Sequence, residues 1–387
     1  MTKQLKITLI AGIITFLFLN TVQAQKSTYF PERTEWERKN PSEVKLNPTK
    51  LAEAVKFAQE NEYSGDKDLK IAILKGFARE PYHYLAGPVR DRGNPAGLII
   101  KNGYIVAEWG DIERVDMTFS VTKSYLSTVA GLAYDRGLIK STADQLTNYI
   151  WDGTFSGRHN QKISWDHLLT QSSDWSGDLF GMKDWADRPP RDGDIDDWKA
   201  RELKEPGTFF EYNDVRVNVL AYSLLQVWRK PLPVVLKENL MDKIGASSTW
   251  RWFGYDHAWV NVDGQKVQSV TGGGHSGGGI FINTLDHARF GLLFLNEGKW
   301  NGQQIISKQW IEKATQSSAA NERYGYMWWL NKGVNQWEGF SDNVYYAAGF
   351  GGNFIVVDRE HDLVVVTRWL EPSKIKDFME LVSKSIK

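Results

Sequence analysis

The 387-residue sequence has no cysteine and no excess of either charge. The absence of cysteine excludes disulfides, thiolate catalysis, zinc–cysteine sites and acylation as a lipoprotein. The 47 basic and 47 acidic residues balance, which argues against a nucleic-acid partner and against a polybasic contact with a membrane surface. The seven histidines show no spacing typical of metal ligands, so no metal site is predicted.

The N-terminus has the pattern of a secretory signal. Lys3 and Lys6 give it positive charge, residues 7–19 form an apolar run, and Val22-Gln23-Ala24 offers small residues for cleavage. The apolar run is too short for a comfortable membrane span. We therefore expect cleavage near Ala24 and an exported protein, periplasmic in a two-membrane bacterium, with no stable membrane span afterwards.

The strand pattern predicts one antiparallel sheet built from both ends of the chain. Two apolar runs flank Asn102-Gly103, which predicts a β-hairpin over residues 97–109. Further strands are expected at 324–330, 344–348, 354–358 and 363–369. With helices on the faces of this sheet, the fold class is α+β.

Between residues 140 and 270 the pattern is one of short helices and loops, which predicts an inserted all-helical domain. The remaining residues, 25–139 and 271–387, would then form an α/β sheet domain behind a signal peptide at 1–24. The loop at 174–198 is long enough to be functional or mobile. The 17 tryptophans predict either core packing or an aromatic-walled cleft for an apolar or sugar-like substrate.

Ser120 opens a long, mostly apolar helix, and Lys123 follows one turn later. Residues three apart share a helix face, so the hydroxyl and the amine would lie side by side. An amine whose pKa is lowered can accept the proton of the serine hydroxyl. Ser42, Ser64 and Ser373 have the same spacing to a lysine but no such helix. The alternative is that Ser120 only caps the helix.

Two later segments add candidate groups. Tyr212 precedes a predicted helix over 215–228, with Asp214 as its expected N-cap, and a tyrosine near an ammonium can serve as a base or proton shuttle. Residues 347–353 form a glycine-rich joint at a strand end, where a backbone N–H could complete an oxyanion hole with that of Ser120. Simple packing at the tyrosine and a β-bulge at the glycines are the alternatives.

Two weaker patterns are also present. Ser276 lies in a Gly-x-Ser-x-Gly sequence, but the residues after it are strand-like, whereas a nucleophile elbow leads directly into a helix. A glycine-rich turn is therefore the better interpretation. Residues 192–197 resemble the start of a calcium loop, but they lack its glycine and Leu203 stands in place of its glutamate, which favours a solvated acidic loop.

In order along the chain, Ser120-Val121-Thr122-Lys123, Tyr212-Asn213-Asp214 and Ala347-Ala348-Gly349 resemble the three motifs of the serine β-lactamase and penicillin-binding-protein superfamily. The chain is most similar to the class C-like branch, which includes family VIII carboxylesterases and 6-aminohexanoate-dimer hydrolases. The resemblance covers about residues 90–370 and implies a β-lactamase-like fold.

The resemblance also implies roles for individual residues. Ser120 would be the acylated nucleophile, Lys123 its base, and Tyr212 a second base or acid. The backbone N–H groups of Ser120 and Phe350 would form the oxyanion hole. The implied substrate-binding residues are Asp214, Trp175, Ala348 and Gly349. No metal or organic cofactor is implied.

The sequence departs from the family pattern at Asp214, where asparagine is frequent, and at Ala347, where a lysine or histidine usually helps to hold a substrate carboxylate. Losing that contact costs roughly 1.5 to 3 kcal/mol. We therefore expect an exported serine hydrolase that cleaves a small-molecule or short-peptide ester or amide without a recognised carboxylate. A DD-peptidase or weak β-lactamase is one alternative, and a catalytically silent homologue that binds a peptide or glycan is another.

Overall fold

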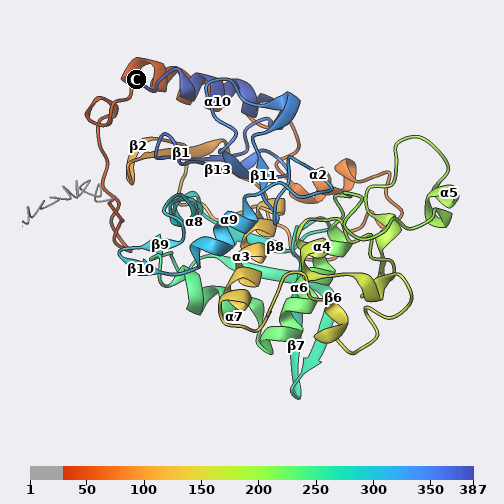
Figure 1. Ribbon diagram of the computed structural model, residues 1–387. Coiled ribbons are helices and arrows are strands. Elements are labelled where there is room, and N and C mark those ends of the chain that lie inside the picture. Colours follow the sequence, from red (N-terminus) through yellow and green to blue (C-terminus); the bar gives the residue numbers. More distant parts are fainter. Residues whose placement is uncertain (1–28) are drawn as a thin grey trace, which may run out of the picture.

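Strands from both ends of the chain meet in one six-stranded sheet in the computed structural model, which describes residues 29–387 (Figure 1). Its strands are β1 (Ala96–Lys101), β2 (Tyr104–Trp109), β11 (Trp329–Leu330), β12 (Tyr345–Gly349), β13 (Asn353–Asp358) and β14 (Leu363–Arg368). The order is β11-β12-β13-β14-β1-β2, antiparallel throughout. The predicted α+β arrangement is confirmed. The predicted signal peptide lies outside the described residues.

The predicted hairpin at Asn102-Gly103 forms, because both residues adopt the positive φ that a tight two-residue turn requires. The predicted strand at 324–330 is wrong over most of its length. Met327 has a φ of 61°, which turns the chain so that Tyr324 pairs back with Trp329. Only the last two residues of that segment join the sheet.

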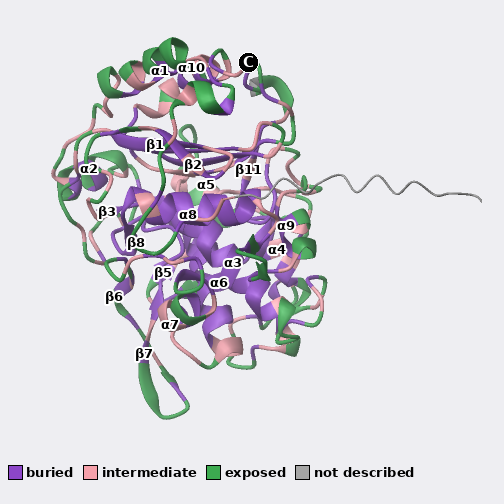
Figure 2. Cartoon of the chain, turned by 90° about the vertical axis from the view of Figure 1, so that its left-hand side faces the viewer, coloured by how far each residue is buried: buried purple, intermediate pink, exposed green. Residues whose placement is uncertain are grey.

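Helices cover both faces of the sheet (Figure 2). The helices α1 (Pro48–Glu60) and α10 (Ile375–Ser383) lie on one face, and α8 (Thr284–Leu295) lies on the other. Strand β1 shows why the sheet needs both layers: Ile99 packs in the cluster of α1 and α10, whereas Leu98 and Ile100 pack in the cluster of α8. None of the helices within residues 29–387 is long and apolar enough to cross a membrane.

Below α8 lies a second helical layer with α3 (Thr122–Asp135) at its centre. Its neighbours there are α4 (Trp165–Leu169), α6 (Asp214–Trp228), α7 (Leu232–Leu236) and α9 (Lys308–Ala314). Every residue of α3 from Thr122 to Ala133 is buried. A side chain carried on this helix is therefore held in place from all sides, as a precisely positioned catalytic group needs to be.

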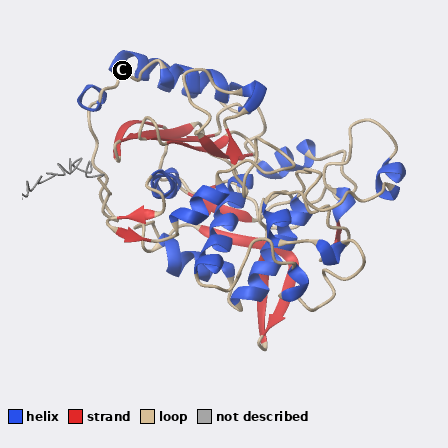
Figure 3. Ribbon diagram, in the orientation of Figure 1, coloured by secondary structure: helices blue, strands red, loops and turns tan. Residues whose placement is uncertain are grey.

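The expectation of an all-helical segment at 140–270 is wrong at its end (Figure 3). The strands β6 (Arg251–Val262) and β7 (Gln265–Val270) form a long hairpin that turns at Asp263-Gly264, both at positive φ. They join β3 (Asp116–Met117) and β8 (Gly279–Ile282) in a second sheet of order β3-β8-β6-β7. The division into a sheet domain and an inserted domain stays a prediction.

The remaining elements are short. They are α2 (Leu69–Gly76), α5 (Ile195–Ala200), β4 (Asp178–Leu179), β5 (Met182–Lys183), β9 (Lys299–Trp300), β10 (Gln303–Gln304), a π-helical turn (Lys237–Met241) and several single 3₁₀ turns. The acidic residues at 192–197 lie around the start of α5, where the side chain of Asp194 accepts a hydrogen bond from the N–H of Asp196. Their role there is that of a helix cap.

Candidate active site

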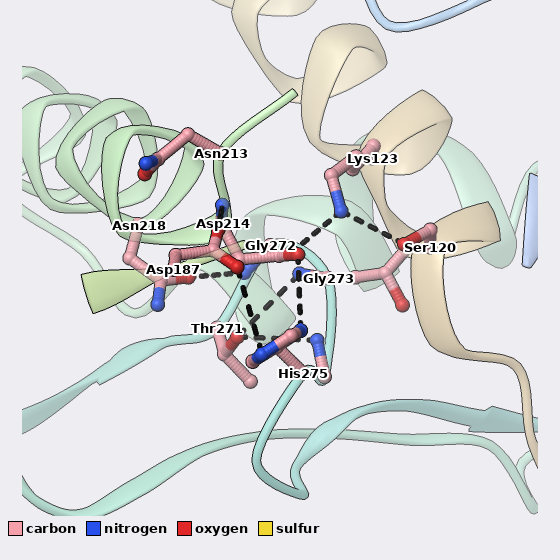
Figure 4. A network of polar contacts seen from close by, with 12 residues as sticks. Ser120, Lys123, Asp187, Asn213, Asp214, Asn218, Thr271, Gly272, Gly273 and His275 are labelled. Atoms are coloured by element: carbon pink, nitrogen blue, oxygen red, sulfur yellow. Dashed lines mark hydrogen bonds and ion pairs between the residues drawn. The ribbon is translucent and has the colours of Figure 1, made fainter. Parts of the chain in front are cut away.

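Ser120 lies in a 3₁₀ turn, Phe119–Val121, that leads into α3. Lys123 is one turn further and only 1% exposed, and its Nζ lies 2.8 Å from Ser120 Oγ (Figure 4). The serine does not cap α3, because the N-cap position is Val121 and no side chain bonds to the first turn. The alternative of a mere helix cap is therefore wrong, and the predicted contact between hydroxyl and amine is present.

The residue before the serine is held in an unusual conformation. Phe119 has a φ of 50°, in the left-handed region that a large side chain adopts only at a cost in energy. Its ring packs 5.0 Å from that of Phe350 and 6.5 Å from that of Trp369, which holds it there. This sharp bend directs Ser120 towards the cavity.

Lys123 also forms a buried ion pair with Asp214, whose Oδ1 lies 2.6 Å from Nζ. The other carboxylate oxygen lies 2.7 Å from Arg188 NH1. Burial by itself raises the pKa of Asp214, but Lys123 and Arg188 outweigh it and hold that pKa well below its usual range. Asp214 is therefore a carboxylate at neutral pH, and its charge is balanced by two cations.

Two expectations for Asp214 are wrong. The N-cap of α6 is Asn213, whose side chain accepts the N–H of Arg216 at 3.0 Å. Asp214 is the first residue of the helix, so its side chain is free to reach Lys123. It is not among the residues that line the cavity at Ser120, and its Oδ1 contacts Lys123 Nζ instead.

A network that no sequence motif indicated supports this ion pair from behind. Arg188 donates to Asp187 Oδ1 at 2.7 Å and to His275 Nδ1 at 3.1 Å. His275 Nε2 lies 2.5 Å from Glu80 Oε2. A guanidinium can only donate hydrogen bonds, so His275 Nδ1 accepts one from Arg188. The other ring nitrogen, Nε2, then carries the hydrogen and donates a hydrogen bond to Glu80. The one sequence indication of this network was that Arg188 belongs to the long loop at 174–198.

Glu80, Asp187 and His275 offer potential metal-ligand atoms within 4.8 Å of one another, and they are the one such group among the described residues. Their contacts explain the cluster without a metal. Arg188 already donates a hydrogen bond to the carboxylate of Asp187, and His275 already donates one to Glu80. A cation at this point would also be repelled by the guanidinium. The cluster fits an ion-pair network better than a metal site.

The glycine-rich loop before β8 packs directly on the lysine. Its backbone is anchored by Asn218 Oδ1, which accepts the N–H of Gly272 at 2.9 Å. A Cβ atom on Gly273 would overlap both Asp214 Oδ1 and Lys123 Nζ. Only glycine therefore leaves room for the ion pair at this position, a requirement the sequence alone did not reveal.

We expect Gly273→Ala to lower kcat/KM by about 100-fold, because displacing Lys123 misplaces a reacting group. Stability should fall by about 1 to 3 kcal/mol from overpacking. The control is Gly157→Ala, where a Cβ meets nothing within 4 Å, so only the cost of its left-handed backbone remains. Ester turnover and denaturant unfolding measure both effects. Equal activity of the two variants would contradict the role of Gly273.

Tyr212 lies beside Lys123 and Arg188, the two cations that contact Asp214. Lys123 Nζ is 4.7 Å from the centroid of its ring, and the guanidinium of Arg188 is 5.2 Å from it. Trp329 stacks on the ring at 5.7 Å. Tyr212 and Ser120 line the same cavity. The structure thus brings together Ser120, Lys123 and Tyr212, as the resemblance to the superfamily implies.

The end of β12 approaches the serine closely. A Cβ atom on Gly349 would collide with the carbonyl oxygen of Thr118 and lie 3.3 Å from the backbone nitrogen of Ser120. In the described part of the chain, no hydrogen bond joins the N–H of Ser120 or of Phe350 to another group. Both residues line the same cavity, so these two backbone donors are candidates for an oxyanion hole.

A cavity of about 610 Å³ opens over Ser120. Its aromatic lining residues are Tyr63, Phe77, Tyr212, Trp329, Tyr346, Phe350 and Phe354. The predicted substrate-binding residues Ala348 and Gly349 also line it, whereas Ala347 is 1% exposed and packs in the core. The walls are therefore largely apolar.

Trp175, another predicted substrate-binding residue, does not line this cavity. It is 2% exposed, and its indole N–H donates to the carbonyl oxygen of Thr154 at 2.8 Å, so it is a core residue. Ser276 is likewise 2% exposed, and the loop around it leads into strand β8 and not into a helix. This agrees with the interpretation of that sequence as a glycine-rich turn.

The fold and the Ser120–Lys123 pair define the class of this protein as a serine hydrolase. The family model described as Beta-lactamase matches residues 113–369. The chain belongs to the Beta-lactamase family.

Relatives of the chain are distant. An uncharacterised protein of Alkalihalophilus pseudofirmus is 23% identical over 70% of this chain and 81% of its own length. A 6-aminohexanoate-dimer hydrolase of Paenarthrobacter ureafaciens is 24% identical over 56% of each chain. The solved structure of EstCE1, a hydrolase with promiscuous acyltransferase activity, is similar at a TM-score of 0.57 and 14% identity, over 87% of this chain and 98% of that one.

Proposed function

We propose that this protein is an exported enzyme that hydrolyses an ester or amide through an acyl-enzyme on Ser120. The observation that carries the proposal is the buried Lys123, bonded at once to Ser120 Oγ and to Asp214 beside an aromatic cavity. Export rests on the predicted signal peptide. The similarity to EstCE1 and to a 6-aminohexanoate-dimer hydrolase supports ester or amide chemistry.

In the first half-reaction, Lys123 first releases the ammonium proton that it holds in the ion pair with Asp214. Ser120 Oγ then bonds to the carbonyl carbon as its proton passes to the neutral amine. The N–H groups of Ser120 and Phe350 stabilise the oxyanion. Tyr212 gives its phenolic proton to the leaving group as the old bond breaks. In the second half-reaction the phenolate takes a proton from water and the hydroxide bonds to the acyl carbon. The bond from that carbon to Ser120 Oγ then breaks, the acid product leaves, and Lys123 returns its proton to Ser120.

The third motif lacks the cation that is usual in the family. Ala347 occupies the position where the family usually has a cation, and its side chain is buried. This motif therefore supplies no positive side chain beside the scissile bond. This favours an esterase or amidase over a DD-peptidase or a β-lactamase, whose substrates carry a carboxylate near the scissile amide. The intact contact between Ser120 and Lys123 counts against a catalytically silent homologue.

Covalent labelling tests the proposal directly. The protein is treated with a fluorophosphonate, digested, and the adduct located by mass spectrometry. We expect the label on Ser120, since its oxygen faces the cavity and Lys123 can take its proton. A panel of p-nitrophenyl esters then reports turnover. An adduct on Ser276, or the absence of both adduct and turnover, would reject the proposed mechanism.

A further inference from the structure

Tyr212 lacks the support that the other two candidate catalytic residues have. Ser120 lies in the turn that leads into the buried helix α3, and Lys123 lies in that helix. Residues 211–213, in contrast, belong to neither a helix nor a strand. The tyrosine therefore depends on tertiary contacts for its place beside Lys123. Those contacts matter for the reaction, because the efficiency of a proton-transferring group depends on its geometry.

Gln171 supplies such contacts on both sides of the tyrosine. Its backbone carbonyl oxygen accepts the N–H of Glu211 at 3.0 Å, and its side-chain Oε1 accepts the N–H of Asn213 at 2.9 Å. One residue thus holds the backbone immediately before and immediately after Tyr212. Gln171 is 2% exposed, so these hydrogen bonds are shielded from water and strengthened by their surroundings.

The side chain of Gln171 also reaches an aromatic ring that packs on Tyr212. Its Nε2 donates a hydrogen bond to the hydroxyl of Tyr324 at 2.8 Å. The ring of Tyr324 meets the ring of Tyr212 edge-on at 6.2 Å, and it lies 4.8 Å from the ring of Trp329. Gln171 therefore fixes the backbone of Tyr212 and also orients a ring against which the phenol packs.

The conformation of Gln171 shows that its side chain matters. Beyond the end of α4 the backbone forms a Schellman motif, in which the N–H of Gln171 bonds to the carbonyl oxygen of Leu168 at 3.2 Å. The N–H of Ser172 bonds to that of His167 at 2.9 Å. This motif needs a left-handed residue, and Gln171 has a φ of 53°. Glycine is usual there because it adopts that conformation without steric cost. The glutamine side chain offsets the cost through the contacts it makes.

We propose that Gln171 is the positioning residue for Tyr212, holding the phenol in the place from which it protonates the leaving group. This inference rests on the proposed function and adds a residue that no motif indicated. Gln171 is not among the residues that line the cavity, so it acts through Tyr212 and not on the substrate. Its loss should spare the attack by Ser120, because the contact of Ser120 with Lys123 does not involve it.

Two kinds of ester separate leaving-group protonation from nucleophilic attack. An ethyl ester needs a proton on its departing alkoxide, whereas a p-nitrophenyl ester expels a stable phenolate without one. The test measures kcat/KM for pairs of these esters that share an acyl group, because kcat/KM reports the steps up to loss of the leaving group. Gln171→Met should lower kcat/KM by about 10- to 100-fold for the ethyl ester and by less than about threefold for the p-nitrophenyl ester.

Further variants distinguish positioning from a general loss of structure. Gln171→Gly should show the same selective loss, because glycine suits the left-handed conformation and only the side-chain hydrogen bonds are missing. Adding Gln171→Met to Tyr212→Phe should cause no additional loss on the ethyl ester, since both changes affect one step. The control Gln268→Met, outside the cavity, removes a similar pair of hydrogen bonds, to Gly254 and Tyr255 on β6. It should keep the wild-type ratio of the two rates.

Equal losses on both esters, or additive losses in the double variant, would overturn the inference. Fluorophosphonate labelling of Ser120 separates this result from failure of the proposed function, because fluoride leaves without a proton from Tyr212. The label should therefore form on Gln171→Met at close to the wild-type rate. If the wild type turns over no ethyl ester, with or without labelling, a crystal structure of Gln171→Met decides the positioning role. Displacement of Tyr212 from its place beside Lys123 supports that role, and an unmoved Tyr212 refutes it.

Discussion

Ser120→Ala is expected to lower ester turnover on the order of 10⁴-fold or more, because no other group can form the acyl-enzyme. Ser276→Ala should leave turnover unchanged. Both serines lie in sequence patterns found at nucleophiles, with the weaker pattern at Ser276, and the structure distinguishes them further. Ser120 lines the cavity and contacts Lys123, whereas Ser276 is 2% exposed in a turn before β8. Initial rates on a p-nitrophenyl ester measure the effect.

The pair of variants is matched in chemistry, since each removes one hydroxyl. Fluorophosphonate labelling should disappear in Ser120→Ala and persist in Ser276→Ala. Both proteins should unfold within about 1 kcal/mol of the wild type, because removing one hydrogen-bonding hydroxyl has a small net cost. If Ser276→Ala proved inactive while folded, a nucleophile elbow would have to be reconsidered in spite of the strand that follows it.

Features fixed by neighbouring residues could be predicted from the sequence. Asn102-Gly103 specifies its own hairpin through the positive φ of both residues, and the helix expected over 215–228 corresponds to α6. The contact of Ser120 with Lys123 is local in the same sense, because one helical turn brings the two together. Such signals do not depend on how the rest of the chain folds.

The features that could not be predicted join distant segments. Glu80, Arg188 and His275 come from three parts of the chain, and their spacing in the sequence does not indicate that they meet behind Asp214. The expected role of Asp214 was wrong as well: the N-cap is Asn213, and the carboxylate of Asp214 contacts Lys123 instead of lining the cavity. Tertiary contacts decided these positions.

The β6–β7 hairpin was missed although its turn, Asp263-Gly264, has the same form as Asn102-Gly103. Its first strand alternates buried and exposed residues unevenly and contains Gly254, where a register shift begins. An interrupted alternation is a weak strand signal. Arg323 was missed because it directly precedes the segment expected to be a strand, 324–330. The chain turns at Met327 within that segment, and Arg323 lines the cavity.

Lys123→Met is expected to impair catalysis and stability together, for two separable reasons. Activity should fall by about 10² to 10⁴, the usual contribution of a general base. Stability should fall by about 3 to 5 kcal/mol, because Asp214 then keeps a buried charge with only Arg188 to balance it. Methionine preserves most of the volume of this 1% exposed side chain, so the loss reflects charge and not a cavity.

The double variant Lys123→Met/Asp214→Asn separates the two effects. Removing the orphaned carboxylate should restore most of the stability but none of the activity, and the single Asp214→Asn completes the cycle.

The pH dependence of stability gives a second readout. Asp214 has a depressed pKa in the folded state, so its stabilisation is full above about pH 4 and is lost as the pH falls below that value. Denaturant unfolding from pH 7 down to pH 3 should therefore show a steeper loss in the wild type than in the double variant. Equal slopes in the two proteins would mean that the buried pair does not contribute to stability, and recovery of activity in the double variant would remove Lys123 from the mechanism.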